Sequence, residues 1–220
     1  MNTKMKAMPA DLPHIPQIPE AVRTILVRQN PGLPMPDLVS YYVLENDRKL
    51  YLDGDVDNNI LNQQRMILRW NMEDAGRPAE ERKPIHLYIF SGGGDVDVMW
   101  SLVDAIETSE TPVYTVNMGV AASAAGIIYL AGHKRFMMPR SRLVIHEGSA
   151  CMAGDAVKVM DASESYKRMI RQMKDYIVSR TKISSATLNR QRCHDWELDA
   201  AYCLEHGACE KIVESIRDVL

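Results

Sequence analysis

Apolar positions along the chain follow two spacings. From residue 38 onward, short apolar runs typical of strands alternate with stretches whose apolar residues recur every three or four positions, as on one face of a helix. The expected strands are 38–44, 49–54, 85–90, 112–118, 134–138 and 141–148, and the expected helices are 58–74, 96–108, 124–132 and 154–179. Residues 76–84, 91–95 and 119–123 are expected to be loops or turns. This alternation predicts an α/β domain built from stacked ββα units.

The first part of the chain lacks this alternation. Prolines recur throughout residues 9–36, and proline removes a backbone donor and fixes φ, which excludes a continuous helix or central strand there. The sequence therefore predicts two parts, a proline-bearing N-terminal arm over 1–37 and one compact domain over 38–220.

Composition narrows the function classes. The 220 residues are 46% hydrophobic, which is enough for a substantial core, and the net charge of -3 gives no electrostatic reason to expect nucleic acid or an anionic membrane as a partner. No segment reads as a signal peptide or a membrane span, so we expect a cytoplasmic protein. The cysteines are interpreted as reduced structural thiols without metal-ligand spacing, so no metal site is expected: Cys151, Cys193, Cys203 and Cys209.

One serine, Ser123, lies among small residues in the stretch GVAASAAG. At the junction of a strand and a helix, its hydroxyl would be held at a tight turn, with the free N–H groups of the helix start aimed at a developing oxyanion. The alternative is a closely packed helix start that Ser123 merely caps. This stretch alone favours neither interpretation.

A nucleophilic serine needs a base, and His146 is the best candidate because it directly follows an apolar strand and precedes a loop. His86 lies inside a strand, His133 lies in a turn, His206 lies at a helix end and His14 lies in the proline-bearing arm. These four are interpreted as structural or surface residues. The glycine turn SGGGD offers backbone N–H groups that could complete an oxyanion hole, although a triple glycine alone is a weak signal.

The order SGGGD, GVAAS, SRLVIHEG and HDWELDAAYCLEHGACEKIV resembles the Clp protease proteolytic subunit family over about residues 38–216. The resemblance implies a ClpP/crotonase-like fold, Ser123 as nucleophile, His146 as general base and Asp195 as the carboxylate that orients the histidine. From the residues alone, Glu197 and Asp199 remain rivals of Asp195, and Asp199 is also a candidate helix cap.

The same resemblance implies an oxyanion hole made by the N–H groups of Gly93 and Ala124. The chain departs from the family pattern at Gly92, where the family has proline, which adds conformational freedom to the turn. A second departure is Glu147, directly after the histidine, where the family often has glutamine.

The family's long handle helix corresponds to residues 154–179, with Met169, Met173 and Ile177 along one side. The alternative is an ordinary amphipathic helix packed on its own domain. The resemblance implies a heptameric ring or double ring that encloses the active sites and hydrolyses unfolded polypeptides or peptides, fed by an AAA+ unfoldase. It implies no cofactor in this subunit, and ATP only on the partner ATPase.

Three function classes follow. The first is a Clp-type serine endopeptidase, and the second is a catalytically silent ring subunit, which the altered glycine turn keeps open. The third, a crotonase-type acyl-CoA enzyme, shares the fold but commonly uses carboxylates as acid and base. A membrane-bound signal peptidase of the serine–lysine type would require a catalytic lysine and usually an anchor.

Overall fold

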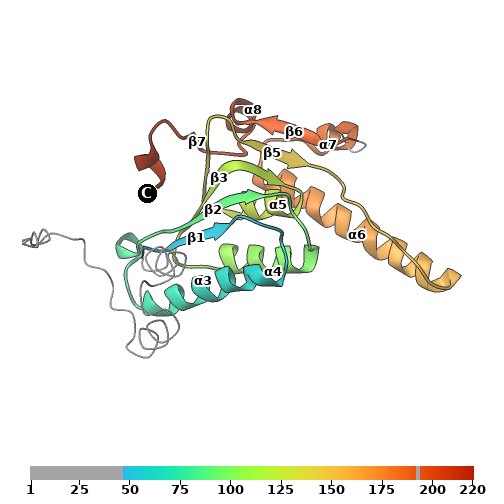
Figure 1. Cartoon of the computed structure of the whole chain (residues 1–220), viewed down its shortest axis with the longest axis horizontal. Helices are drawn as coiled ribbons and strands as arrows, with labels where there is room; N and C mark the ends of the chain where they lie inside the picture. Colours follow the sequence, from blue (N-terminus) through green and yellow to red (C-terminus); the bar gives the residue numbers. More distant parts are fainter. Residues whose placement is uncertain (1–46, 192–193) are drawn as a thin grey trace, which may run out of the picture. The chain divides into compact units, whose positions relative to one another are not determined.

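The computed structural model describes residues 47–191 and 194–220. The compact unit runs from Leu50 to Leu220 and combines one sheet with helices packed against it (Figure 1). The α/β class expected from the sequence is confirmed.

Strands and helices alternate along most of the unit. The strands are β1 (Lys49–Leu52), β2 (Ile85–Ser91), β3 (Val113–Ala122), β4 (Lys134–Met137), β5 (Arg142–Ile145), β6 (Trp196–Asp199) and β7 (Lys211–Ile212). The α-helices are α3 (Leu61–Glu73), α4 (Val96–Glu107), α5 (Ala124–Ala131), α6 (Ala156–Arg180), α7 (Ser185–Gln191) and α8 (Ala200–Glu205). Short 3-10 helices are η1 (Asn58–Ile60), η2 (Ala79–Glu81) and η3 (Ile216–Val219).

Strand β3 is shared between two sets of neighbours. The sheet order is β1-β2-β3-β4-β7, and β5 also pairs with β3. Residues 114–117 of β3 pair in parallel with β4, whereas residues 120–122 pair in parallel with β5. Because β2 pairs with β3 along the opposite edge, the carboxyl end of β3 has β2 on one side and β5 on the other. Strand β6 pairs with β5 in antiparallel orientation and so adds one more strand to the sheet beside β5.

Helix α5 lies at the centre of the packing. All eight of its residues are buried, in agreement with its sequence AAGIIYLA, which is apolar on every face. It contacts β3, α4 and α6. Helix α4, whose N-terminus is capped by the side chain of Asp95, adds Met99, Leu102 and Ile106 to the same core.

Helix α6 is the long helix expected over residues 154–179. It has 25 residues, of which only Ile177 is buried. Met173 packs against the core, whereas Val157 and Met160 near the N-terminus are each 67% exposed. Figure 1 shows this N-terminal part extending away from the sheet.

Most expected elements are present, with ends shifted by a few residues. The expected turn over 119–123 is wrong as far as Ala122, because these residues continue β3 and pair with β5 and with β2. The expected loop 76–84 contains η2. The expected strand 38–44, the domain boundary at 38 and the arm over 1–37 lie outside the described residues.

Candidate active site

The strand register places the candidate serine beside the candidate histidine. In the parallel pair β3–β5, Ala122 lies opposite Val144. The N–H of Ser123, the next residue, donates to the Val144 carbonyl at 2.9 Å. His146 follows two residues after Val144, so both strands deliver their candidate side chains at the same edge of the sheet.

Ser123 has a backbone conformation that is rare for a residue with a side chain. Its φ of 53° and ψ of -125° lie outside the regions that L-residues favour. It connects the end of β3 to the start of α5, and its side chain makes no capping hydrogen bond to α5. The interpretation of Ser123 as an ordinary helix cap is therefore wrong. A strained serine between a strand and a helix is the geometry of a nucleophile elbow.

The antiparallel pair β5–β6 brings the histidine to a carboxylate. Ile145 lies opposite Trp196, so His146 and Asp195 are adjacent across the two strands. Nδ1 of His146 lies 3.5 Å from Oδ1 of Asp195. The histidine side chain is 32% exposed and the aspartate side chain 75% exposed, so this pair lies at the surface of the subunit.

The two rival carboxylates have other partners. Glu197 pairs with Arg142, with 3.1 Å between Oε2 and Nη1. Asp199 caps α8 by accepting the N–H of Tyr202 at 2.7 Å. Of the three acids, only Asp195 has a contact with His146 among the described residues.

The glycine turn packs directly against the serine. Gly93 has a φ of 102°, and a β-carbon at this position would lie 2.7 Å from both Cβ of Ser123 and the carbonyl oxygen of Ala122. It would also lie 3.1 Å from the nitrogen of Ala124. The two predicted oxyanion donors, Gly93 and Ala124, are thus brought together beside Ser123, and glycine is required by the close approach.

One of these donors already has an acceptor. The N–H of Gly93 donates to Oγ of Ser91 at 3.1 Å, and Ser91 is buried. Sequence reasoning missed this serine, because nothing in SGGGD distinguishes its hydroxyl from that of any residue at the end of a strand.

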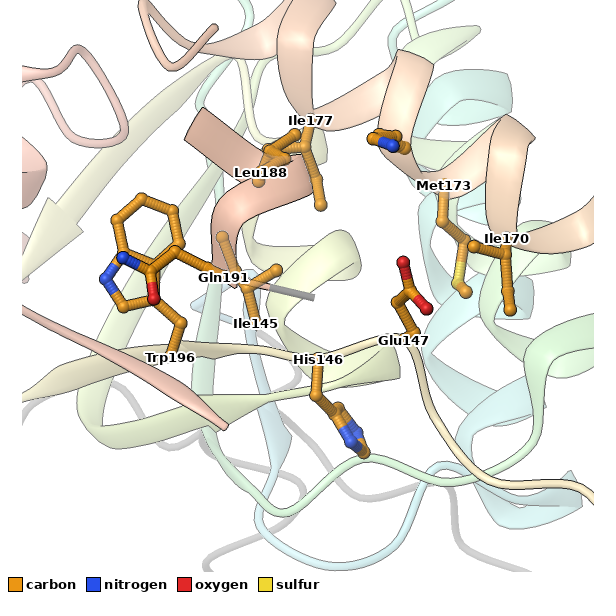
Figure 2. A pocket seen from close by; sticks show the side chains of 10 residues that line it. Ile145, His146, Glu147, Ile170, Met173, Ile177, Leu188, Gln191 and Trp196 are labelled. Atoms are coloured by element: carbon orange, nitrogen blue, oxygen red, sulfur yellow. The ribbon is translucent and has the colours of Figure 1, made fainter. Parts of the chain in front are cut away.

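An apolar pocket lies beside the candidate histidine. It opens to solvent and is bounded by β5, α6, α7 and β6. Figure 2 shows Trp196 and Met173 on opposite sides of this pocket and His146 at its edge. The lining residues are Ile145, His146, Glu147, Ile170, Met173, Lys174, Ile177, Leu188, Gln191 and Trp196.

Two residues at this pocket bear on the sequence analysis. Glu147 lines it, as expected for a residue that could shape the surroundings of the base, and its carbonyl accepts the hydroxyl of Tyr166 at 3.0 Å. Trp196 was missed. Its indole packs edge-on against Tyr202, with ring centroids 5.6 Å apart, which fixes one wall of the pocket.

The far end of α5 is held by an arginine from α6. Arg180 donates to three carbonyls there: Leu130 at 2.9 Å, Ala131 at 3.2 Å and Gly132 at 2.8 Å. Arg135 in turn donates to the carbonyl of Arg180 at 2.6 Å and pairs with Glu210. These bonds fix the helix whose other end carries Ser123.

Three of the remaining histidines have structural contacts. His86 is buried in β2. Nδ1 of His133 accepts the N–H of Val113 at 3.0 Å, and burial lowers the pKa of this ring. His206 stacks on Tyr202, with ring centroids 3.8 Å apart. The structural interpretation of these three is confirmed, and His14 lies outside the described residues.

The cysteines divide into two kinds. Burial raises the pKa of Cys203 to about 12 and that of Cys209 to about 11, which fits inert structural thiols. Cys151 is exposed, so burial gives no structural role there. Cys193 lies outside the described residues.

Within residues 47–191 and 194–220, no group of three or more histidine, cysteine, aspartate or glutamate side chains is arranged to hold a metal ion. In the same residues, no helix combines the length and the apolar character needed to cross a bilayer.

Together, the α/β fold, the strained serine at a strand-to-helix junction and the adjacent histidine–aspartate pair define a hydrolase-like site. Comparison with known proteins gives the family: the Clp protease family model matches residues 37–216, and the chain belongs to this family.

Several relatives of the chain are named as proteolytic subunits of ATP-dependent Clp proteases. The chain is 34% identical over 139 residues to the ATP-dependent Clp protease proteolytic subunit 2 of Treponema pallidum, covering 62% of this chain and 70% of that one. It is 30% identical over 186 residues to the ATP-dependent Clp protease proteolytic subunit of Chlorella vulgaris, covering 83% and 90%. These are relatives at moderate identity, and they support a peptidase.

A solved structure shows the same fold. A mutant of ClpP1 from Listeria monocytogenes superposes with a TM-score of 0.69 at 22% sequence identity, covering 81% of this chain and 98% of that one. The ClpP-like fold expected from the sequence motifs is confirmed.

Proposed function

We propose that this protein is a serine endopeptidase subunit that hydrolyses peptide bonds through an acyl-enzyme. Ser123 Oγ attacks the scissile carbonyl carbon while its proton passes to His146. The tetrahedral intermediate then expels the amine, which takes that proton, and leaves an ester on Ser123. A water molecule, deprotonated by His146, attacks this ester. His146 then returns the proton to Ser123 Oγ as the ester bond breaks, which releases the new carboxyl terminus and the free serine.

The proposed role of Asp195 is to orient His146. A carboxylate beside Nδ1 favours the tautomer in which Nε2 accepts the serine proton, and it stabilises the imidazolium that forms during attack. The contact of 3.5 Å between Nδ1 and Oδ1 supports this role. So does the engagement of Glu197 and Asp199 with other groups.

The proposed oxyanion hole consists of the N–H groups of Ala124 and Gly93. Ala124 is the first residue of α5, where the backbone N–H has no acceptor within the helix and the helix dipole favours negative charge. The close approach of Gly93 to Ser123 supports the second donor.

The proposed substrates are unfolded polypeptides or peptides with an apolar side chain next to the cleaved bond. The apolar pocket beside His146 supports this preference, because isoleucine, leucine, methionine and tryptophan side chains form most of its lining.

The proposed assembly is a heptameric ring or a double ring, with α6 as the handle that contacts another ring. The exposed Val157 and Met160 on the projecting part of α6 support a role in contact between subunits. An AAA+ unfoldase that binds ATP is the proposed partner, since the names of the relatives describe ATP-dependent proteases. Residence in the cytoplasm remains a prediction.

The strained conformation of Ser123 beside Gly93 carries the proposal, since the structure holds this side chain at a cost. The test is labelling of the purified protein with a fluorophosphonate probe, read by intact mass. A single adduct in wild type, absent from Ser123→Ala and His146→Ala, is expected. Ser141→Ala, which changes a buried serine elsewhere, serves as the matched control and should be labelled like wild type.

A catalytically silent ring subunit is the second candidate. The hydrogen bond from the Gly93 N–H to Ser91 favours it, because this bond occupies one proposed oxyanion donor. Absence of any adduct from a folded, assembled wild-type protein would refute a peptidase that is active by itself, and would leave a silent subunit or a site that a partner must switch on.

A further inference from the structure

One side of the glycine turn is fixed by backbone hydrogen bonds. The Gly93 carbonyl accepts the N–H of Val56 at 2.8 Å, and the Val56 carbonyl accepts the N–H of Asp95 at 2.7 Å. A β-carbon on Gly94 would lie 2.4 Å from the Val56 oxygen, so the two segments are in direct contact. The peptide unit that follows Gly93 therefore has no room to rotate.

The preceding peptide unit, between Gly92 and Gly93, is held differently. Its N–H donates to the Ser91 side chain at 3.1 Å. A β-carbon on Gly92 would meet no atom within 4 Å, so space surrounds this unit on that side. This peptide is the part of the turn whose N–H depends on a side chain, and it also carries a proposed oxyanion donor.

We infer that Ser91 is a positioning residue that competes with the substrate oxyanion for the N–H of Gly93. This inference rests on the proposed function. In the substrate-free protein, Oγ of Ser91 accepts the N–H. When the scissile carbonyl becomes an oxyanion, the Gly93 N–H donates to that oxyanion instead of to Ser91, because a charged acceptor forms a stronger hydrogen bond than a neutral hydroxyl. The bond to Ser91 is lost in that step, which reduces the net stabilisation of the transition state.

Glycine at position 92 is consistent with this exchange. Rotation of the 92–93 peptide changes ψ of Gly92 and φ of Gly93, and glycine permits a wider range of both angles than any other residue.

The test compares a transition-state analogue with a ground-state ligand in the Ser91→Ala variant. A trileucine aldehyde forms a tetrahedral adduct with the serine and uses the oxyanion hole, whereas the corresponding alcohol does not. Removing the competing acceptor should lower the inhibition constant of the aldehyde about threefold to tenfold. The kcat/KM for a fluorogenic peptide should rise by a similar factor, with the inhibition constant of the alcohol unchanged.

A purely structural role for Ser91 gives the opposite sign. If its hydroxyl only supported the turn, Ser91→Ala would weaken the aldehyde and reduce kcat/KM. That result, or an unchanged ratio of aldehyde to alcohol inhibition constants, would overturn the inference. Ser91→Cys, which keeps the size but accepts hydrogen bonds weakly, should shift the ratio in the same direction as Ser91→Ala. Ser141→Ala is the control, because its buried hydroxyl donates to Met138 instead.

A second measurement does not depend on catalysis. Hydrogen exchange at the Gly93 amide can be read by mass spectrometry of fragments covering 91–95. It should be faster in the Ser91→Ala/Ser123→Ala double variant than in the Ser123→Ala single variant. An unchanged exchange rate would overturn the inference even if the wild-type protein is an active enzyme. If wild type is not labelled at Ser123, the proposed function and the competition both fail, whereas faster exchange would still demonstrate the Ser91–Gly93 bond.

Discussion

The two ends of α5 are treated in opposite ways by the protein around them. At the C-terminal end, Arg180 donates to three successive carbonyls. At the N-terminal end, the side chain of Ser123 makes no hydrogen bond to the helix, and its backbone is strained. Every helix leaves unsatisfied carbonyls at one end and unsatisfied N–H groups at the other. Here only the carbonyl end is satisfied by a dedicated side chain.

The difference separates the support of the helix from its chemistry. Arg180 is itself held by Arg135, which also pairs with Glu210, so the C-terminal end belongs to a network of charged groups. The N-terminal end is bounded by close backbone approach from Gly93. The C-terminal end of α5 is therefore held in place by charged side chains, whereas the N-terminal end is held by backbone packing that only a residue without a side chain allows.

The largest expected effect is from Gly93→Ala, which adds a side chain where none fits. The new β-carbon would lie 2.7 Å from Cβ of Ser123, and alanine disfavours a φ of 102°. We expect kcat/KM for a fluorogenic peptide to fall by at least about 100-fold. The control is Gly54→Ala, because a β-carbon at this position, outside the site, meets nothing within 4 Å. Equal activity of the two variants would contradict the close packing at this end.

The next effect separates the three carboxylates around the histidine. Asp195→Asn should lower kcat by about 10- to 1,000-fold with little change in stability, because only the orientation and charge of His146 are affected. Asp199→Ala should instead cost about 1 kcal/mol of unfolding free energy through loss of the α8 cap, with kcat nearly unchanged.

Kinetics and urea unfolding of both variants, with Glu197→Gln as a third, measure this contrast. A larger loss of kcat in Glu197→Gln than in Asp195→Asn would show that the assignment of the orienting carboxylate is wrong.

A smaller effect is expected at the opposite end of the helix. Arg180→Ala leaves three carbonyls without their donor and should lower the free energy of unfolding by about 1–3 kcal/mol. Arg171→Ala, an exposed arginine on the same helix, should change it by less than about 0.5 kcal/mol. Urea unfolding of both variants gives the comparison, and equal stabilities would mean that Arg180 does not hold α5.

The smallest effect is expected from Tyr129→Phe in the same helix. The Tyr129 hydroxyl is buried and has no hydrogen-bond partner among the described residues, so its removal should leave stability at neutral pH unchanged or raised by about 1 kcal/mol. Burial raises the pKa of Tyr129 well above that of an unfolded tyrosine. The unfolded chain therefore releases this proton first, and the native state loses stability as pH rises past about 10.

Tyr129→Phe should consequently lose less stability than wild type between neutral pH and alkaline pH. Chemical unfolding at the two pH values measures this difference. A variant with the same alkaline loss as wild type would show that Tyr129 ionises normally in the folded protein.

Local pattern was sufficient for much of the fold. Helix α5 was predicted because a short apolar run follows the GVAAS stretch and ends at a glycine, and α4 because its apolar residues recur at helical spacing. The error over 119–122 has a non-local cause, because these residues become strand only when β5, a separate segment, pairs with them. Local residue preferences do not contain that information.

The candidate site shows the same division. The glycine turn, Ser123 and His146 stand out in the sequence because each follows an apolar run. Asp195 does not, since it is one of three acids within five residues. The family resemblance selected it from the sequence, and the β5–β6 register places it beside His146. Ser91 gave no signal at all, because its significance depends on which backbone N–H lies near its hydroxyl.

The conformation of Ser123 also sets a limit on how stable this protein is. A residue with a side chain at φ 53° and ψ -125° costs on the order of 1–3 kcal/mol, a cost that glycine largely avoids. Glycine at position 123 would relieve the strain and remove the only hydroxyl in GVAASAAG. Selection for stability alone would therefore favour an inert protein, and the active sequence is kept below its maximum stability by the residue that we propose does the chemistry.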